Sequence, residues 1–236
     1  MAVKEAIILA GGEGKRLKPV IGDLPKILAP IGEQPFINYL LRNLSEVGIK
    51  RFILALGKGK HLVKDYCRKF LSKEDFIFSE ETRPLGTGGA LRKALEKAKS
   101  LIVLASNGDS LVLSKQLRST IESLAESDFP IGIIGLQVEN TYRFGRMVVD
   151  KKTKKLLCFQ EKYVKGPGII NSGLYVLKKE LLLNILPPKN YPFLFEEWLE
   201  KKIRNDDIRV GVEVISGYFV DIGIPEDYSR AQRELR

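Results

Sequence analysis

Residues 6–26 read AIILAGGEGKRLKPVIGDLPK, an apolar run that enters a glycine-rich loop and continues to Arg16 and Lys26. An apolar run bounded by glycines predicts a buried strand, and similar runs alternate with helical patterns downstream, which predicts an α/β fold with a parallel sheet. Glycine lets backbone N–H groups approach an anion closely, and Arg16 and Lys26 would neutralise its charge. The stretch therefore predicts a loop that holds a nucleoside triphosphate.

Two better-known phosphate-binding loops do not fit this stretch. A P-loop needs serine or threonine after its Gly-Lys pair. None of the Gly-Lys pairs at 14–15, 57–58 and 59–60 is followed by either residue. The dinucleotide fingerprint fails because Leu17 occupies the position of its third small residue. The loop is thus of another nucleotide-binding type.

The pattern of apolar and polar residues predicts one domain without repeats or linkers. The expected strands lie at about 4–10, 50–56, 75–79, 101–106, 131–138, 145–150, 155–161, 169–177, 208–215 and 218–221. The expected helices lie at about 35–47, 60–71, 87–98, 114–126, 178–186 and 193–204, with a last helix that begins near Pro225.

Composition narrows the functional classes. The chain has a net charge of +10, but its lysines are spread thinly, so we favour a solvated basic surface over nucleic-acid binding. No apolar run approaches the length of a membrane span, and the start lacks the layout of a signal peptide, so we expect a cytoplasmic protein without a membrane partner. Cys67 and Cys158 are isolated and indicate neither a disulfide framework nor a zinc site.

Five motifs in order give the chain a resemblance to the sugar-1-phosphate nucleotidyltransferases. They are Ala10–Leu17 with Leu24-Pro-Lys26, Pro84–Ala90 (PLGTGGA), Asn107-Gly-Asp109, Glu161-Lys162 with Asn171-Ser-Gly173, and Phe219–Gly223 (FVDIG). The closing residues 219–228 and the short length most resemble the heptose 1-phosphate guanylyltransferase branch. The resemblance implies a Rossmann-like, mostly parallel mixed sheet flanked by helices, the GT-A-like fold of nucleotide-diphospho-sugar transferases. It also implies a nucleotide-binding half at about 1–128 and a sugar-phosphate-binding half at about 129–236.

The implied reaction moves a nucleotidyl group from a nucleoside triphosphate to a sugar 1-phosphate and releases pyrophosphate. It needs no protein nucleophile, in agreement with a single histidine and the absence of G-x-S-x-G. The catalytic residues that the resemblance implies are Arg16, Lys26, Asp109, Lys162 and Asp221. Asp109 follows an apolar run and is expected at the carboxyl end of a strand, where it would hold Mg²⁺ together with Asp221.

The resemblance also implies the remaining contacts. The nucleotide-binding residues would be Leu9, Ala10, Gly11, Gly12, Gly14, Arg16, Glu81, Pro84, Gly86 and Gly88. The sugar phosphate would contact Glu161 and Lys162, the side chain of Asn171, the backbone of Gly173 and the N–H of Gly145.

The resemblance implies that the residue three before Pro84, which is Glu81, faces the edge of the nucleobase. A carboxylate can accept both the N1–H and the N2–H₂ of guanine, which favours GTP, although the neighbouring Glu80 leaves the register open. Mannose 1-phosphate with GTP, another sugar with UTP or dTTP, and a catalytically silent regulatory homologue remain alternatives. The sequence is compatible with a homodimer and fixes no oligomeric state.

Overall fold

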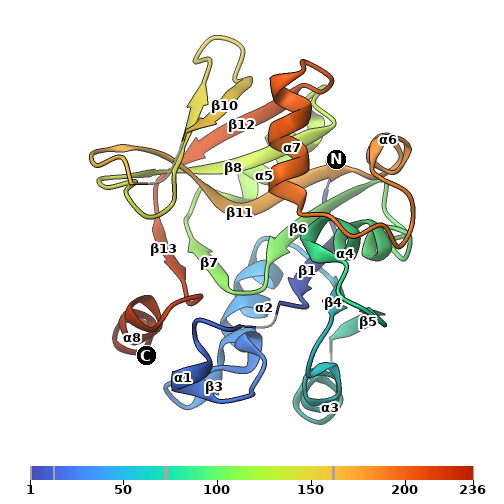
Figure 1. Ribbon diagram of the computed structural model, residues 1–236, viewed down its shortest axis with the longest axis vertical. Coiled ribbons are helices and arrows are strands. Elements are labelled where there is room, and N and C mark those ends of the chain that lie inside the picture. The colour runs from blue at the N-terminus through green and yellow to red at the C-terminus, as the bar shows by residue number, and fades with distance from the viewer. Residues whose placement is uncertain (1, 13, 72–73, 161–162, 236) are drawn as a thin grey trace.

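The computed structural model describes residues 2–12, 14–71, 74–160 and 163–235, and a nine-stranded mixed sheet forms its centre (Figure 1). The first half of the chain contributes neighbouring parallel strands in the order β6 (Ile102–Asn107), β1 (Glu5–Ala10), β4 (Arg51–Leu56) and β5 (Asp75–Glu80). The strands β1, β4 and β6 are short apolar runs buried on both faces, the pattern that a parallel sheet between helices requires.

The second half of the chain extends this sheet with strands of mixed direction. The long β11 (Gly168–Lys178) pairs antiparallel with β6 and so joins the two halves. Beside it lie β8 (Ile131–Val138), antiparallel to β11, and β12 (Val210–Ile215), parallel to β8. The strand β9 (Arg146–Val149) pairs with β11 and with β10 (Leu156–Gln160). The predicted single α/β domain with a mixed, helix-flanked sheet is confirmed.

Helices cover both faces of the sheet because the strand residues alternate between two cores. In β1, Ala6 and Ile8 face one core while Ile7 faces the other. The first core receives side chains from α2 (Phe36–Glu46), α3 (Lys60–Phe70), α5 (Leu117–Glu126) and α8 (Pro225–Glu234). The second receives them from α4 (Gly86–Leu95), α6 (Lys179–Ile185) and α7 (Phe195–Arg204).

Several short elements were not predicted. They are α1 (Lys18–Ile21), a 3₁₀ turn (Lys26–Leu28), the hairpin strands β2 (Pro30–Ile31) and β3 (Gln34–Pro35), and β7 (Ser110–Leu113). The strand β7 pairs antiparallel with β13 (Tyr218–Asp221) in a small sheet of its own. These elements are too brief to show a hydrophobic period.

The C-terminal helix lies against the N-terminal half of the chain. Figure 1 shows β13 descending from the upper strands, so that α8 comes to lie near α1 and β3. The Tyr228 hydroxyl and the Gln232 amide both donate to the carbonyl of Pro30, at 2.6 and 2.8 Å. Asp221, which ends β13, is thereby held beside the segment that carries Lys26. Among the described residues, no helix is long and apolar enough to cross a membrane.

Candidate active site

A cavity of about 380 Å³ opens at the carboxyl ends of β1 and β6. Open α/β sheets bind their ligands at this edge. The residues that line the cavity come from the first glycine loop, the 3₁₀ turn that begins at Lys26, the segment from Glu81 through the PLGTGGA motif, the Asn107-Gly-Asp109 turn and residue 194. They are Leu9, Ala10, Gly11, Gly12, Lys26, Ile27, Glu81, Pro84, Gly86, Thr87, Ala90, Asn107, Gly108, Asp109 and Leu194. Three motifs that are far apart in the sequence thus share one cavity.

The first glycine loop packs closely against the residues around Gly57 and against Glu81 at Gly11, whereas Gly12 has open space. A Cβ at Gly57 would lie 2.6 Å from the carbonyl oxygen of Gly11, and one at Gly11 would lie 3.3 Å from Glu81 Oε1. Gly14 has a φ of +63°, and the stem of Lys26 packs over it, 3.1 Å from where a Cβ would be. The loop therefore brings backbone N–H groups and Lys26 to one place.

Glu81 lies half-buried in the cavity wall just after β5. Its backbone N–H donates to the carbonyl of Leu56, and its Oε2 accepts the backbone N–H of Leu85 at 3.1 Å. Burial raises the pKa of this carboxyl, while the Leu85 N–H and the charge of Lys93 lower it. The neighbouring Glu80 points elsewhere: its carboxylate pairs with Lys64 at 2.6 Å and Lys60 at 3.3 Å. Of these two neighbouring glutamates, it is Glu81 that lines the cavity, so its role in reading the base stays the prediction to be tested.

The two glycines of the PLGTGGA motif that were predicted to contact the base have different surroundings. Gly86 lines the cavity with a φ of +70°. Gly88 is buried against Phe193, whose ring would lie 2.1 Å from a Cβ there, and its N–H donates to the Phe193 carbonyl. In this structure Gly88 makes room for the chain that covers α4 and is not among the residues that line the cavity, so its predicted contact with the base stays untested.

Lys26, Asp109, Asp221 and Arg16 converge around Gly223. Lys26 Nζ donates to Asp109 Oδ2 at 2.5 Å. The point that a Gly223 Cβ would occupy lies 2.8 Å from Asp221 Oδ1 and 3.6 Å from both Asp109 Oδ2 and an Arg16 guanidinium nitrogen. The pairing of β7 with β13 brings about this meeting, since Asp221 lies opposite Ser110. Four of the predicted catalytic residues are therefore brought together.

The surroundings of Asp221 disfavour its ionised form. Burial and the charge of Asp109 raise the pKa of Asp221 to about 6, against the opposing effects of the Gly223 N–H and Lys26. A buried pair of like charges is relieved by a cation, and two carboxylates suit Mg²⁺, which takes its other ligands from phosphate oxygens and water. Among the described residues, no cluster of three or more His, Cys, Asp or Glu could hold a metal. Any ion here would therefore depend on ligands from the substrate.

The predicted sugar-side residues lie on β11 and the loop before β9. A bulge in β11 places Asn171 and Gly173 side by side, and the Gly173 N–H donates to Asn171 Oδ1 at 3.0 Å. The Gly145 N–H donates to the carbonyl of Thr141 at 3.2 Å. Both N–H groups that were expected to face the sugar thus have internal acceptors in this structure. Glu161 and Lys162 lie outside the described residues.

Sequence reasoning missed an interaction that holds Asn171. Glu196, in the first turn of α7, accepts hydrogen bonds from Tyr175 at 2.9 Å and from Asn171 at 3.0 Å. Asn171 also donates to the Tyr175 hydroxyl at 2.7 Å. Burial raises the pKa of Tyr175, so this hydroxyl stays protonated as a donor. A glutamate near the start of a helix has the ordinary signature of a helix terminus, and no local signal points to this contact.

A second missed feature is the ion pair between Arg143 and Asp227. The two side chains form a bidentate pair at 2.9 and 2.6 Å, and Asp227 is buried in the first turn of α8. The pair fastens α8 to the loop that precedes Gly145. Because α8 also holds Pro30, the helix links the Lys26 segment to the sugar-side loop.

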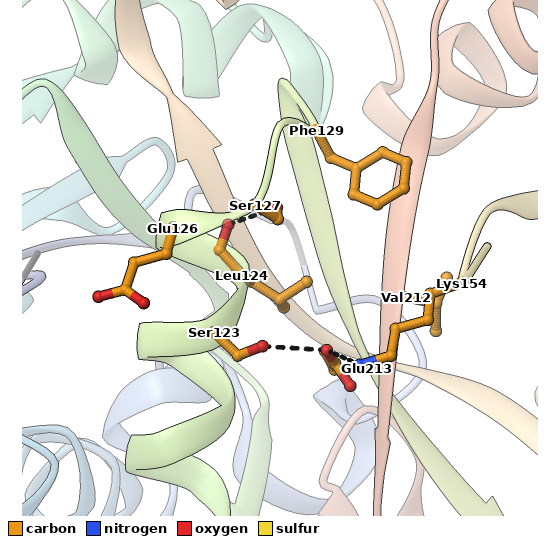
Figure 2. Close-up of a pocket in the computed structure, with 8 residues that line it drawn as sticks. All are labelled: Ser123, Leu124, Glu126, Ser127, Phe129, Lys154, Val212 and Glu213. Atoms are coloured by element: carbon orange, nitrogen blue, oxygen red, sulfur yellow. Dashed lines mark hydrogen bonds and ion pairs between the residues drawn. The ribbon is translucent and has the colours of Figure 1, made fainter. Parts of the chain in front are cut away.

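A second hollow, of about 330 Å³, lies between α5 and β12. Figure 2 shows Glu213 between Ser123 and Lys154, and its Oε1 accepts from them at 3.0 and 2.5 Å. The residues that line it include none of those predicted for the site within the described chain. Since the carboxylate there is already paired within the protein, the candidate active site remains the cavity at the strand ends.

Comparisons with known proteins agree with this arrangement. A family model described as nucleotidyl transferase matches residues 5–236. D-glycero-alpha-D-manno-heptose 1-phosphate guanylyltransferase from Aneurinibacillus thermoaerophilus is 34% identical, covering 98% of each chain. The protein of the same description from Campylobacter jejuni is 33% identical, covering 95% of this chain and 96% of that one. The crystal structure of HddC from Yersinia pseudotuberculosis complexed with GMP-PN superposes with a TM-score of 0.86 and 32% identity, covering 99% of this chain and all of that one.

Proposed function

This chain belongs to the nucleotidyl transferase family, and from that premise we propose that it transfers the guanylyl group of GTP to a sugar 1-phosphate and releases pyrophosphate. We propose D-glycero-D-manno-heptose 1-phosphate as the acceptor, because two relatives that align over nearly the whole chain bear that activity in their names. The products would be a GDP-heptose and pyrophosphate.

One observation carries the proposal: a single cavity is lined by Glu81, by the glycine loop, and by Lys26 with Asp109. A guanine bound at Glu81 would meet a carboxylate that can accept its N1–H and N2–H₂ together. Uracil and thymine present a donor beside acceptors, so a lone carboxylate matches them less well. In the same cavity, Lys26 and Asp109 would lie at the phosphates.

The residues around Gly223 suit the chemistry of nucleotidyl transfer. An oxygen of the sugar phosphate attacks the α-phosphorus of GTP, the new P–O bond forms, and the bond to the bridging oxygen of pyrophosphate breaks. We propose that Arg16 binds the β- and γ-phosphates, where its planar fork stabilises the leaving group. Lys26 would leave its contact with Asp109 for the α-phosphate, and Lys162 would bind the sugar phosphate.

We propose Mg²⁺ as the cofactor, held by Asp109 and Asp221. The support is that Asp221 Oδ1 and Asp109 Oδ2 lie 2.8 and 3.6 Å from the point that a Gly223 Cβ would occupy. Burial and the nearby charge of Asp109 also raise the pKa of Asp221, an effect that a bound cation would oppose. The ion would supply charge neutralisation at the α-phosphate when bound.

The sugar subsite is proposed at the bulge of β11 and the loop before β9. Asn171 and Gly173 would contact the sugar from the bulge, Glu161 would bind hydroxyl groups, and Gly145 would approach from the facing loop. The N–H groups of Gly173 and Gly145 donate to Asn171 Oδ1 and to the Thr141 carbonyl in this structure. Contact with the sugar through these N–H groups therefore requires them to change partners on binding.

The division into a nucleotide-binding half at 1–128 and a sugar-binding half at 129–236 follows from these placements and is part of the proposal. A cytoplasmic location is proposed because that is where a nucleoside triphosphate is supplied. A homodimer stays compatible with the sequence, which fixes no oligomeric state.

The proposal is tested by measuring pyrophosphate release with Mg²⁺ over a grid of nucleoside triphosphates and sugar 1-phosphates. The grid contains GTP, ATP, UTP, CTP and dTTP against heptose, mannose, glucose and N-acetylglucosamine 1-phosphates. We expect the largest kcat/KM for GTP with the heptose phosphate. If kcat/KM is largest for another pair, the proposed type of reaction stands and the proposed substrates are refuted. Folded protein that is silent in every combination would favour a regulatory homologue.

A further inference from the structure

Three lysines from two helices converge on the end of β5, directly behind Glu81. Lys93 from α4 donates to the carbonyl of Glu80 at 2.6 Å, and Lys60 from α3 donates to the carbonyl of Glu81 at 3.1 Å. Lys60 and Lys64 also pair with the Glu80 carboxylate. The two peptide groups that precede the turn into the cavity are therefore each held by an ammonium group.

This arrangement is not explained by helix or sheet formation alone. A lysine ammonium is usually solvated, and fixing the long side chain costs conformational entropy. Lys60 from α3 and Lys93 from α4 are half-buried and reach backbone carbonyls at the point where the chain leaves β5 for the cavity. Bonds between a charged donor and a carbonyl are stronger than those between neutral groups, so they restrain the direction in which Glu81 leaves the strand.

Lys93 also acts on the charge of Glu81. Burial raises the pKa of the Glu81 carboxyl, and the positive charge of Lys93 opposes that rise together with the Leu85 N–H. The other charged groups at this edge are Lys60, bound to the Glu81 carbonyl, and Glu80, which is paired with Lys64. Across the cavity lie Lys26 and Asp109, which pair with each other. Lys93 is thus the cation that favours an ionised Glu81.

We propose that Lys93 is a positioning residue for guanine recognition, which anchors the Glu80 peptide and thereby directs the Glu81 carboxylate into the cavity. The inference rests on the proposed function, since it requires Glu81 to bind the base. A protonated Glu81 could accept only poorly from guanine, because one of its oxygens would itself carry a hydrogen. Recognition of GTP would then depend on Lys93 without any contact between Lys93 and the nucleotide.

The test compares Lys93→Met with Lys93→Arg, which keeps a cation, and with Lys64→Met, which removes a cation that binds the Glu80 carboxylate and not a backbone carbonyl. For Lys93→Met we expect kcat/KM for GTP to fall about tenfold, mainly through KM, as for the loss of one charge-assisted hydrogen bond. The acid limb of its pH profile should move to higher pH, because Glu81 then loses the cation that opposes protonation. Lys93→Arg and Lys64→Met should retain the wild-type acid limb.

The Glu81→Gln variant separates this inference from the proposed function. If Glu81→Gln leaves the preference for GTP over UTP unchanged, base reading by Glu81 is refuted and the inference falls with it. If Glu81→Gln lowers kcat/KM for GTP more than for UTP, the variant that combines Glu81→Gln with Lys93→Met decides. Lys93→Met should then have little further effect, and its pH shift should disappear. Two outcomes would show that Lys93 is purely structural and would overturn the inference. One is an equal loss of kcat/KM for GTP from Lys93→Met in the wild-type and Glu81→Gln backgrounds. The other is a pH profile of Lys93→Met that is lower than that of wild type but has its acid limb at the same pH.

Discussion

Replacing Asp221 by asparagine should make the protein more stable while removing its activity. Burial and Asp109 raise the pKa of Asp221 from 3.8 to about 6. Because the folded pKa is above the unfolded one, ionisation of Asp221 destabilises the fold. The penalty begins as pH rises above the unfolded pKa and is complete above the folded one. Each unit corresponds to about 1.4 kcal/mol, so the penalty reaches up to about 3 kcal/mol near neutral pH.

Asparagine removes this penalty and keeps the local geometry. Its side-chain oxygen can still accept the Gly223 N–H, which Asp221 Oδ1 accepts at 2.7 Å. For a chain of this size, about 3 kcal/mol corresponds to a rise in Tm of up to about 10 °C. The same variant should lose most of its turnover, because the proposed Mg²⁺ site then lacks one carboxylate. A group that costs stability and supports activity is typical of a functional site.

The assay is thermal unfolding of wild type and Asp221→Asn with EDTA, at about pH 7.5 and about pH 4. The rise in Tm of Asp221→Asn over wild type should be large at the higher pH. It should shrink at the lower pH, where Asp221 is largely protonated in the folded wild type. Asp150→Asn is the control, because Asp150 is exposed and the Lys152 N–H lowers its pKa, so its loss should bring no gain. An Asp221→Asn protein that is no more stable than wild type at about pH 7.5 would refute the reasoning.

Three further outcomes are expected. Arg16→Ala should lower kcat at least about 100-fold, as for the loss of a group that stabilises charge in the transition state, with an unchanged circular dichroism spectrum; near-normal turnover would contradict its role. Gly88→Ala should lower the free energy of unfolding, measured by chemical denaturation, by about 1–3 kcal/mol because its Cβ would overlap the Phe193 ring. Gly12→Ala is the control and should leave this free energy nearly unchanged, because a Cβ there would have open space. Glu196→Gln should raise KM for the sugar phosphate more than KM for GTP, and equal increases in steady-state titrations would argue against a positioning role on β11.

Much of the fold could be predicted because its signals are local. The strand β1 is an apolar run followed by glycines, and the structure has it at Glu5–Ala10. The predicted helix at 60–71 ends one residue earlier, at Phe70. The hairpin at Pro30–Pro35 and the strand β7 escaped prediction, since two to four residues carry no readable period. The direction of β11 against β6 also depends on pairing between distant segments.

Within the site, motif order and local pattern predicted residue types better than their partners. Glu81 was predicted from the family resemblance and its spacing to Pro84. Only the structure shows that the Glu80 carboxylate engages Lys60 and Lys64 while Glu81 lines the cavity. Gly88 was predicted as a contact to the base, whereas Phe193 occupies the space beside it. The PLGTGGA motif indicated that glycine is needed at position 88, but it did not indicate that the Phe193 ring is the group that packs against it.

By itself the sequence determined the α/β class, the glycine loop after the first strand and the acidic residues at the strand ends. These follow from periodicity and turn chemistry, which act over a few neighbouring residues, and from the order of short motifs along the chain. Only the tertiary structure decided that Asp221 meets Asp109 around Gly223, that Glu196 holds Asn171, and that Lys93 stands behind Glu81. Such contacts join residues up to more than a hundred positions apart, and their energies depend on burial and distance, which exist only once the sheet has assembled.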